Sequence, residues 1–150
     1  MDILTKVKKD HDNIHVLLQQ IITKAKEGNK INILVEDFLE EVKEHMEAEK
    51  ACIAEMLMEE KKLPFQINKE ILSKALSEKL YQDFGKVYEN KELESKLYAL
   101  DKLLQEHSHY TEDIISLLSQ ECISDQKSEE LGARFEQEKV KTLINSITYA

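Results

Sequence analysis

The chain has 150 residues and a formal net charge of −9, with 34% charged and 41% hydrophobic residues. These proportions, together with 3 Gly, 1 Pro and no Trp, are typical of one soluble helical domain and argue against a disordered chain. The acidic charge and the lack of a Lys/Arg cluster argue against binding that depends on neutralising phosphates. We therefore expect neither nucleic acid nor an anionic membrane surface as a partner.

Two further features bear on location. No segment is apolar over the roughly 18 residues that a membrane-spanning helix needs, and the first residues contain no apolar run suited to a signal peptide. The two cysteines, Cys52 and Cys122, fit no CxxC spacing. We interpret them as reduced thiols that pack as small hydrophobic side chains, and we expect a cytoplasmic protein.

Apolar residues recur every three or four positions along residues 3–26 and again along residues 31–62, which predicts two long amphipathic helices. Between these segments, Gly28 and Asn29 predict a turn, because both are common where a helix ends in a left-handed residue. Pro64 predicts the end of the second helix, since its ring removes a backbone donor.

Three more helical segments follow. Residues 69–87 predict a short helix, inserted after a linker and covering a side or end of the bundle, and residues 91–119 predict the third long helix. Residues 126–148 predict the fourth, with Ser124 or Asp125 as its N-cap. The apolar residues of this last helix spread around its cylinder: Leu131, Phe135, Val140, Leu143, Ile144 and Ile147. We predict one all-α domain over residues 1–150, an antiparallel up-down four-helix bundle with a helical insert.

Polar residues occupy positions on these core stripes that should be apolar. His11 lies on the first stripe, His45 and Glu49 lie on the second, and His107 lies on the third. His45 and Glu49 are four residues apart, so they share one face of their helix. Because an isolated buried carboxylate is too unfavourable to keep, Glu49 must be paired, protonated or bound to a metal.

The heights of these residues along the bundle agree. His11 and His45 are equidistant from Gly28 in the predicted turn, so they should face each other. His107 and Glu138 are likewise equidistant from the loop between the last two helices. Imidazole and carboxylate ligands together suit iron, manganese or zinc, and the sequence therefore predicts a metal site inside the bundle. Taken singly, each histidine is also typical of a hydrogen-bonded core residue, and Glu138 of a solvated face.

The segments "KKDHDNIHVLL", "EHMEAEK" and "LLQEHSHY" resemble the hemerythrin-like HHE cation-binding family, whose pattern is His, HxxxE, His, HxxxE on four successive helices. The resemblance covers the chain apart from residues 63–90. It implies an up-down four-helix bundle with a non-haem iron site, commonly two irons bridged by carboxylates. Members bind or sense oxygen, store or sense iron, or handle nitric oxide. The metal ligands that it implies are His11, His45, Glu49, His107 and Glu138.

The fourth motif departs from the family's pattern. The segment "EELGARFEQEK" aligns without gaps with "EEVKEHMEAEK" and places Arg134 where His45 stands in the earlier motif. An arginine stays charged and cannot ligate a metal, so a second iron is in question. Three outcomes are open: a site completed by His15 or His109, a site that holds one metal, and a bundle in which Arg134 replaces the second cation.

The sequence thus favours an iron-binding domain that binds or senses dioxygen, a related diatomic molecule or iron, in preference to an enzyme. On the fourth helix, Glu136 is an alternative to Glu138 as the inward carboxylate. The alternative function is that of a metal-free helical interaction or regulatory module, with the insert helix as its contact surface.

Overall fold

The computed structural model describes residues 1–58, 93–121 and 123–148. These ranges contain no strand and four helices: α1 (Ile3–Lys26), α2 (Asn32–Met58), α5 (Leu93–Glu121) and α6 (Asp125–Thr148). The all-α class and the positions of the four long helices are confirmed. The predicted insert helix at residues 69–87, its linker with Pro64, and Cys122 lie outside the described residues. No helix in the described part of the chain is long and apolar enough to cross a membrane.

Local hydrogen bonds set the ends of the helices. At the start of α1 the Asp2 carboxylate accepts the backbone N–H of Thr5 at 2.8 Å, and at the start of α6 the Ser124 hydroxyl accepts that of Lys127 at 3.1 Å. Ser124 is therefore the N-cap among the two candidates. After α1, Gly28 adopts a φ of 79°, the left-handed conformation that favours glycine, and the chain turns into α2.

The core consists of two apolar clusters, one toward each end of the helices. The first cluster joins the second half of α1 to the first halves of α2 and α5, and the second cluster joins the first halves of α1 and α6 to the second halves of α2 and α5. The first cluster contains Ile14, Leu18, Ile21, Ile22, Ile31, Val35, Phe38, Val42, Leu97, Leu100 and Leu104. The second contains Ile3, Val7, Ala48, Cys52, Ile53, Met56, Ile114, Ile115, Leu118, Leu131 and Phe135.

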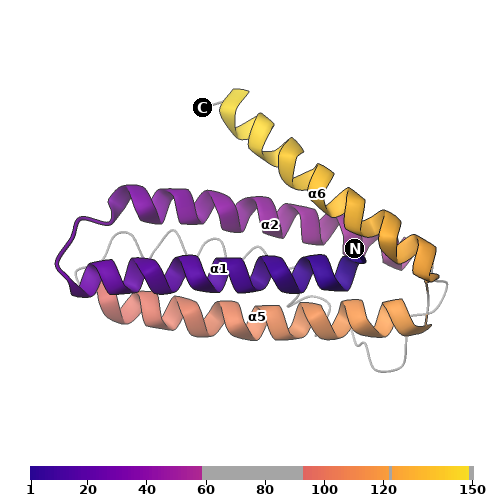
Figure 1. The fold of residues 1–150 in the computed structure, drawn as a ribbon, viewed down its shortest axis with the longest axis horizontal. Coiled ribbons are helices and arrows are strands. Elements are labelled where there is room, and N and C mark those ends of the chain that lie inside the picture. Colours follow the sequence, from indigo (N-terminus) through magenta and orange to yellow (C-terminus); the bar gives the residue numbers. More distant parts are fainter. Residues whose placement is uncertain (59–92, 122, 149–150) are drawn as a thin grey trace.

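This division fixes the direction of each helix. α2 and α5 both run from the first cluster to the second, whereas α1 and α6 both begin at the second. In a strictly alternating bundle of these four helices α2 and α5 would point in opposite directions, so the structure differs from the sequence prediction in this respect. The reason is that α2 ends and α5 begins at opposite ends of the molecule, as Figure 1 shows.

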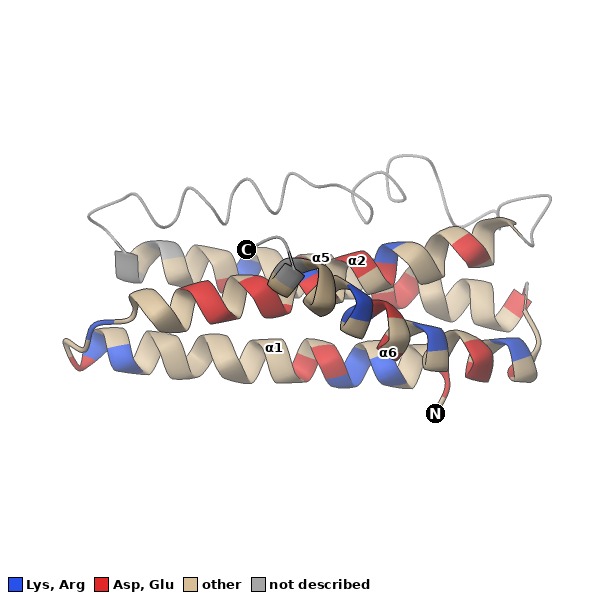
Figure 2. Ribbon diagram, turned by 90° about the horizontal axis from the view of Figure 1, so that it is seen from above, with Lys and Arg blue, Asp and Glu red and all other residues tan. Residues whose placement is uncertain are grey.

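α6 divides into two halves with different apolar faces. In the first half, Leu131 and Phe135 are fully buried, whereas the apolar residues of the second half, Val140, Leu143, Ile144 and Ile147, are 43–69% exposed. At about 100° per residue, Val140 lies about 180° around the helix from Leu131. The apolar face of the second half thus points away from the bundle, and Figures 1 and 2 show α6 lying across α1 and α2 with its C-terminal half leaning away from them.

Substitutions in the two halves of α6 should therefore differ in effect. We expect Leu131→Ala to lower the free energy of unfolding by about 2–5 kcal/mol, because the truncation leaves a cavity in the second cluster. Ile147→Ser, at a side chain that is 69% exposed, should change it by less than about 0.5 kcal/mol. Urea denaturation followed by circular dichroism measures both values, and a large loss in the Ile147 variant would contradict the outward orientation.

Candidate metal centre

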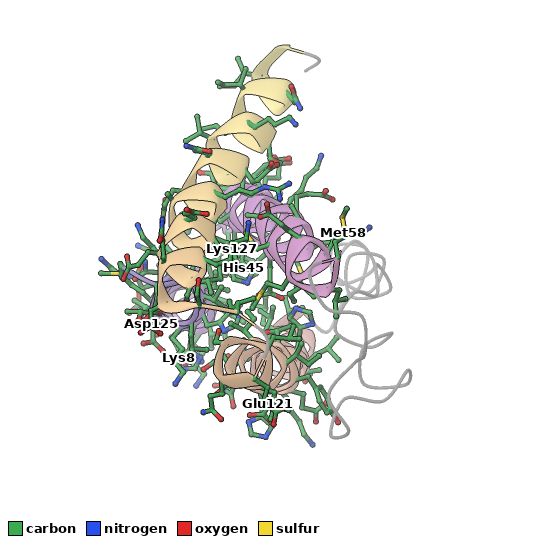
Figure 3. All side chains as sticks on the ribbon, turned by 90° about the vertical axis from the view of Figure 1, so that its right-hand side faces the viewer. Lys8, His45, Met58, Glu121, Asp125 and Lys127 are labelled. Carbon is green, nitrogen blue, oxygen red and sulfur yellow. The ribbon has the colours of Figure 1, made fainter. Side chains whose placement is uncertain are left out.

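A layer of polar side chains separates the two apolar clusters. It lies where the core stripes of α1, α2 and α5 change from apolar to polar residues at the same height. His11, His45, Glu49 and His107 have relative exposures of 9%, 1%, 2% and 8%, so all four are buried as predicted. Figure 3, which looks along the bundle from one end, places His45 in the interior between the helices.

Glu49 is the centre of this layer. Its Oε2 atom lies 2.7 Å from Nε2 of His45 and 3.0 Å from Nε2 of His11. Its Oε1 atom lies 3.1 Å from Nε2 of His107. Imidazoles from three helices thus converge on one carboxylate, each through the same ring nitrogen, and this pairing is what allows Glu49 to be buried.

Further carboxylates hold the outer nitrogens of two of these rings. Nδ1 of His45 lies 2.7 Å from Oδ2 of Asp10, and Nδ1 of His11 lies 2.8 Å from Oε2 of Glu112. Asp10 in turn accepts a hydrogen bond from Nζ of Lys139, on α6, at 2.6 Å. Metal-binding histidines commonly have a carboxylate at the other ring nitrogen, because it fixes the orientation of the ring and makes it a better ligand.

In the metal-free protein, His45 and Glu49 form a charged pair at the centre of the layer. Burial acts to lower the pKa of His45, but the charge of Glu49 and hydrogen bonds with Asp10 and Glu49 outweigh it and raise that pKa to about 9. Burial acts to raise the pKa of Glu49, but the charge of His45 and the hydrogen bonds with the three imidazoles hold it well below its usual range. A metal ion that binds Nε2 of His45 must therefore displace a proton.

The spacing of the donor atoms suits one metal ion. Two ligand atoms that are each about 2.1 Å from an ion and at right angles to each other lie about 3.0 Å apart. The distances from Nε2 to the carboxylate oxygens, 2.7–3.1 Å, fall in this range. Within residues 1–58, 93–121 and 123–148, His11, His45 and Glu49 form the only group of three or more His, Cys, Asp or Glu residues whose ligand atoms all lie within 4.8 Å of one another. These residues can hold a metal ion, with His107 as a neighbouring donor.

The chain matches no protein-family model, no curated protein and no solved structure. The resemblance to the hemerythrin-like family therefore rests on the residues quoted above. What the geometry itself gives is a buried group of imidazoles and a carboxylate that can hold a metal ion.

Glu138 lies outside this group, although it stands three residues after Phe135, on a neighbouring part of the α6 surface. Its Oε1 atom is 3.6 Å from Nε of Arg134, and Nη1 of Arg134 binds Glu55 at 2.9 Å. Phe135 is the residue of α6 that packs against the histidines of the layer, with its ring at 77° to that of His45 and 5.6 Å between the ring centroids. The fourth helix thus closes the layer with an apolar ring where the resemblance implies a ligand.

The remaining candidates also lie away from the layer. Nδ1 of His15 is 2.9 Å from Oδ1 of Asp101, and the His15 side chain is 46% exposed. His109 is 77% exposed and pairs with an aspartate of its own helix. Glu136 forms an ion pair with Lys6 at 3.4 Å and is half exposed. In this geometry neither His15 nor His109 stands in for the histidine that the fourth motif lacks.

Cys52 is a free, buried thiol, as predicted. It lies in the second apolar cluster, one turn from Glu49, and its Sγ atom is 3.6 Å from the carbonyl oxygen of Leu131. Burial raises the pKa of this thiol to about 12, so it stays protonated at neutral pH. Because metals bind the thiolate, Cys52 packs as a small hydrophobic residue and adds no donor to the centre.

Asp10, Glu112 and Lys139 belong to the polar layer but were not predicted from the sequence. Asp10 and Glu112 flank the core stripes of α1 and α5, and each bonds a histidine of a different helix. The chain has 30 acidic residues, so their identity alone does not distinguish them. Their adjacency to the stripes at the height of the histidines is the one signal that points to them.

Asp10→Asn should weaken metal binding without removing a ligand. The substitution takes a negative charge from the hydrogen bond that orients His45, and we expect metal affinity to fall about 10-fold to 100-fold. Competition with a chelator of known affinity measures the change. Asp113→Asn is the matched control, because Asp113 pairs with the exposed His109; equal affinities in the two variants would contradict a role for Asp10.

The metal-free protein should be most stable in mildly acidic solution. The pKa of Glu49 is depressed in the folded state, so its contribution to stability is present above its ordinary pKa of 4.5 and is lost as the pH falls. The pKa of His45 is raised from 6.5 to about 9, so its contribution is complete below pH 6.5 and is lost as the pH rises through 9. In the presence of a chelator, we expect the urea midpoint of unfolding to be highest between about pH 4.5 and pH 6.5. In Glu49→Gln, the urea midpoint should fall less as the pH rises toward 9. A wild-type protein that is equally stable at pH 6 and pH 9 would contradict the pairing.

Proposed function

We propose that this protein is a hemerythrin-like iron-binding domain that holds one non-haem iron in the polar layer and binds or senses dioxygen or a related diatomic molecule. The observation that carries the proposal is the convergence of the Nε2 atoms of three histidines on the carboxylate of Glu49. A buried carboxylate needs compensation, and three imidazoles beside it, once His45 has given up its proton, are a ligand set that suits a divalent iron.

The four residues that would hold the iron are His11, His45, His107 and Glu49. When bound, iron supplies an open coordination position, since four protein donors leave part of its usual coordination free. The chain's own contribution is to orient the rings, through Asp10 and Glu112, and to enclose the layer along the bundle axis between the two apolar clusters.

We propose one iron instead of two because α6 contributes no ligand to the layer. The helix that carries a second ligand pair in the family's pattern presents Phe135 to the layer, and Arg134 is engaged with Glu55 and Glu138. No second group of donors lies within reach among the residues that the structure describes.

A binding or sensing role is favoured over turnover. The ionisable side chains of the layer are bonded to one another: Glu49 to three imidazoles, His45 to Asp10, and His11 to Glu112. A general acid or base has to be able to give or take a proton at the substrate, and these groups are committed to orienting ligands. We place the protein in the cytoplasm, in keeping with the free thiol of Cys52.

The second candidate is a metal-free bundle, and one observation favours it. The same hydrogen bonds that orient the ligands also satisfy Glu49 without a metal, since both of its oxygens already face imidazole nitrogens. A polar layer that is fully paired can persist in a core and fix the register of its helices. In that case the layer is structural, and the protein acts through a partner.

Metal analysis of protein purified from iron-supplemented cells separates the two. We expect about one iron per chain in the wild type, and almost none in His45→Ala or Glu49→Gln, because each substitution removes a central ligand. His109→Ala should keep its iron, since His109 is 77% exposed and away from the layer.

The outcomes of this experiment are distinct. Two irons per chain would contradict the single site. No metal, with a melting temperature that added iron leaves unchanged, would overturn the proposal in favour of the metal-free bundle. An absorption band in the near-ultraviolet or visible range that responds to oxygen would distinguish diatomic binding from iron storage.

A further inference from the structure

We infer that the cavity between α1 and α5 is the route by which a hydrated divalent cation enters the buried centre. The cavity has a volume of about 360 Å³, and its lining includes His11, His15, Asp101, Leu104, Gln105 and Glu112. The inference rests on the proposed function, and it concerns the rate at which the centre fills instead of the ligands that hold the metal.

The cavity reaches the centre at His11, one of its two more exposed ligands. His11 and His107 are 9% and 8% exposed, against 1% and 2% for His45 and Glu49, and of the two it is His11 that lines the cavity. The two apolar clusters close the layer along the bundle axis, and Phe135 closes it on the α6 side. Polar groups also reach the layer from α6, but there Asp10 is bonded to Nζ of Lys139 at 2.6 Å, and that cation opposes the approach of another. Among the described surroundings of the layer, the α1–α5 side is therefore the one where a cavity with acidic lining leads to a ligand.

Polar groups that line the cavity form a series that ends at the ligand His11. Asp101, with a side chain that is 14% exposed, binds Nδ1 of His15 at 2.9 Å and the amide of Gln19 at 3.1 Å. Glu112, with a side chain that is 26% exposed, binds Nδ1 of His11 at 2.8 Å. The opposite nitrogen of His11 faces Glu49. A cation that moves along this series exchanges water for one carboxylate after another before it meets the ligands.

The size and charge of the cavity suit a hydrated divalent cation. A water molecule occupies about 30 Å³ of liquid, so the cavity has room for roughly ten waters, enough for a cation with its first hydration shell. None of the described residues that line it is Lys or Arg, and Asp12, Asp101 and Glu112 give it negative charge. Clefts lined by one sign of charge concentrate the opposite ion and raise its rate of entry.

The test is the kinetics of metal uptake by the metal-free protein, with Fe²⁺ added under argon, or with Co²⁺ as a spectroscopic probe. Asp101→Asn removes a charge from the route at a residue whose hydrogen bonds are to His15, Gln19 and Gln105, none of them a proposed ligand. We expect uptake and release each to slow about threefold to tenfold, with the equilibrium affinity and one-metal stoichiometry unchanged. Raising the salt concentration should slow uptake more in the wild type than in the variant.

A second variant narrows the same passage without changing its charge. Gln105 lines the cavity and is exposed, so Gln105→Trp should slow uptake while leaving the final metal content at the wild-type level. Asp37→Asn, at an exposed position on α2 that is not among the lining residues, is the matched control and should load at the wild-type rate. Circular dichroism of each metal-free variant verifies that its fold is intact.

Wild-type uptake rates in both Asp101→Asn and Gln105→Trp would overturn the inference and leave the proposed function standing. So would a loss of affinity in Asp101→Asn with an unchanged uptake rate, because that result marks a structural role for Asp101. Failure of the wild-type protein to bind Fe²⁺ or Co²⁺ at equilibrium would instead overturn the proposed function, and the entry route with it.

Discussion

The rest of the structure depends on one buried carboxylate. Glu49 is 2% exposed between two apolar clusters, where an unpaired ion would be too unfavourable to keep. Its partners are imidazoles from α1, α2 and α5, so its compensation requires that these three helices hold one relative height. The pairing that makes the charge tolerable thereby also sets the register of the core, whether or not a metal completes it.

Much of this arrangement was predictable from the sequence because two simple periodicities determine it. The spacing of three and four residues identified the core stripes. On the stripe of the second predicted helix the buried residues are Ile31, Val35, Phe38, Val42, His45, Glu49, Cys52 and Met56. The left-handed residue at Gly28 then fixed the relative height of His11 and His45. Local pattern and chain reversal were thus enough to bring together His11, His45, Glu49 and His107.

What the sequence did not predict depends on how helices rotate and run relative to one another. The gapless alignment of the second and fourth motifs places Arg134 at the position that corresponds to His45, but α6 presents the next residue, Phe135, to the layer. The alternation predicted for four helices also failed to anticipate that α2 and α5 point the same way. Asp10 and Glu112 escaped notice because each bonds a ring on another helix, and no local pattern records such a pair.

Because the apolar face changes along α6, the two halves of that helix cannot both bury their apolar residues against the bundle. A helix turns as one rod, so any rotation that carried Val140 and Ile147 toward the bundle would carry Leu131 and Phe135 out of it. The polar layer is closed on this side only while Phe135 faces it, and with Phe135 inward the apolar stripe beyond Lys139 faces solvent. The centre is therefore closed in the same state in which the apolar stripe of α6 is exposed. A rotation of the helix that buried the stripe would also open the centre.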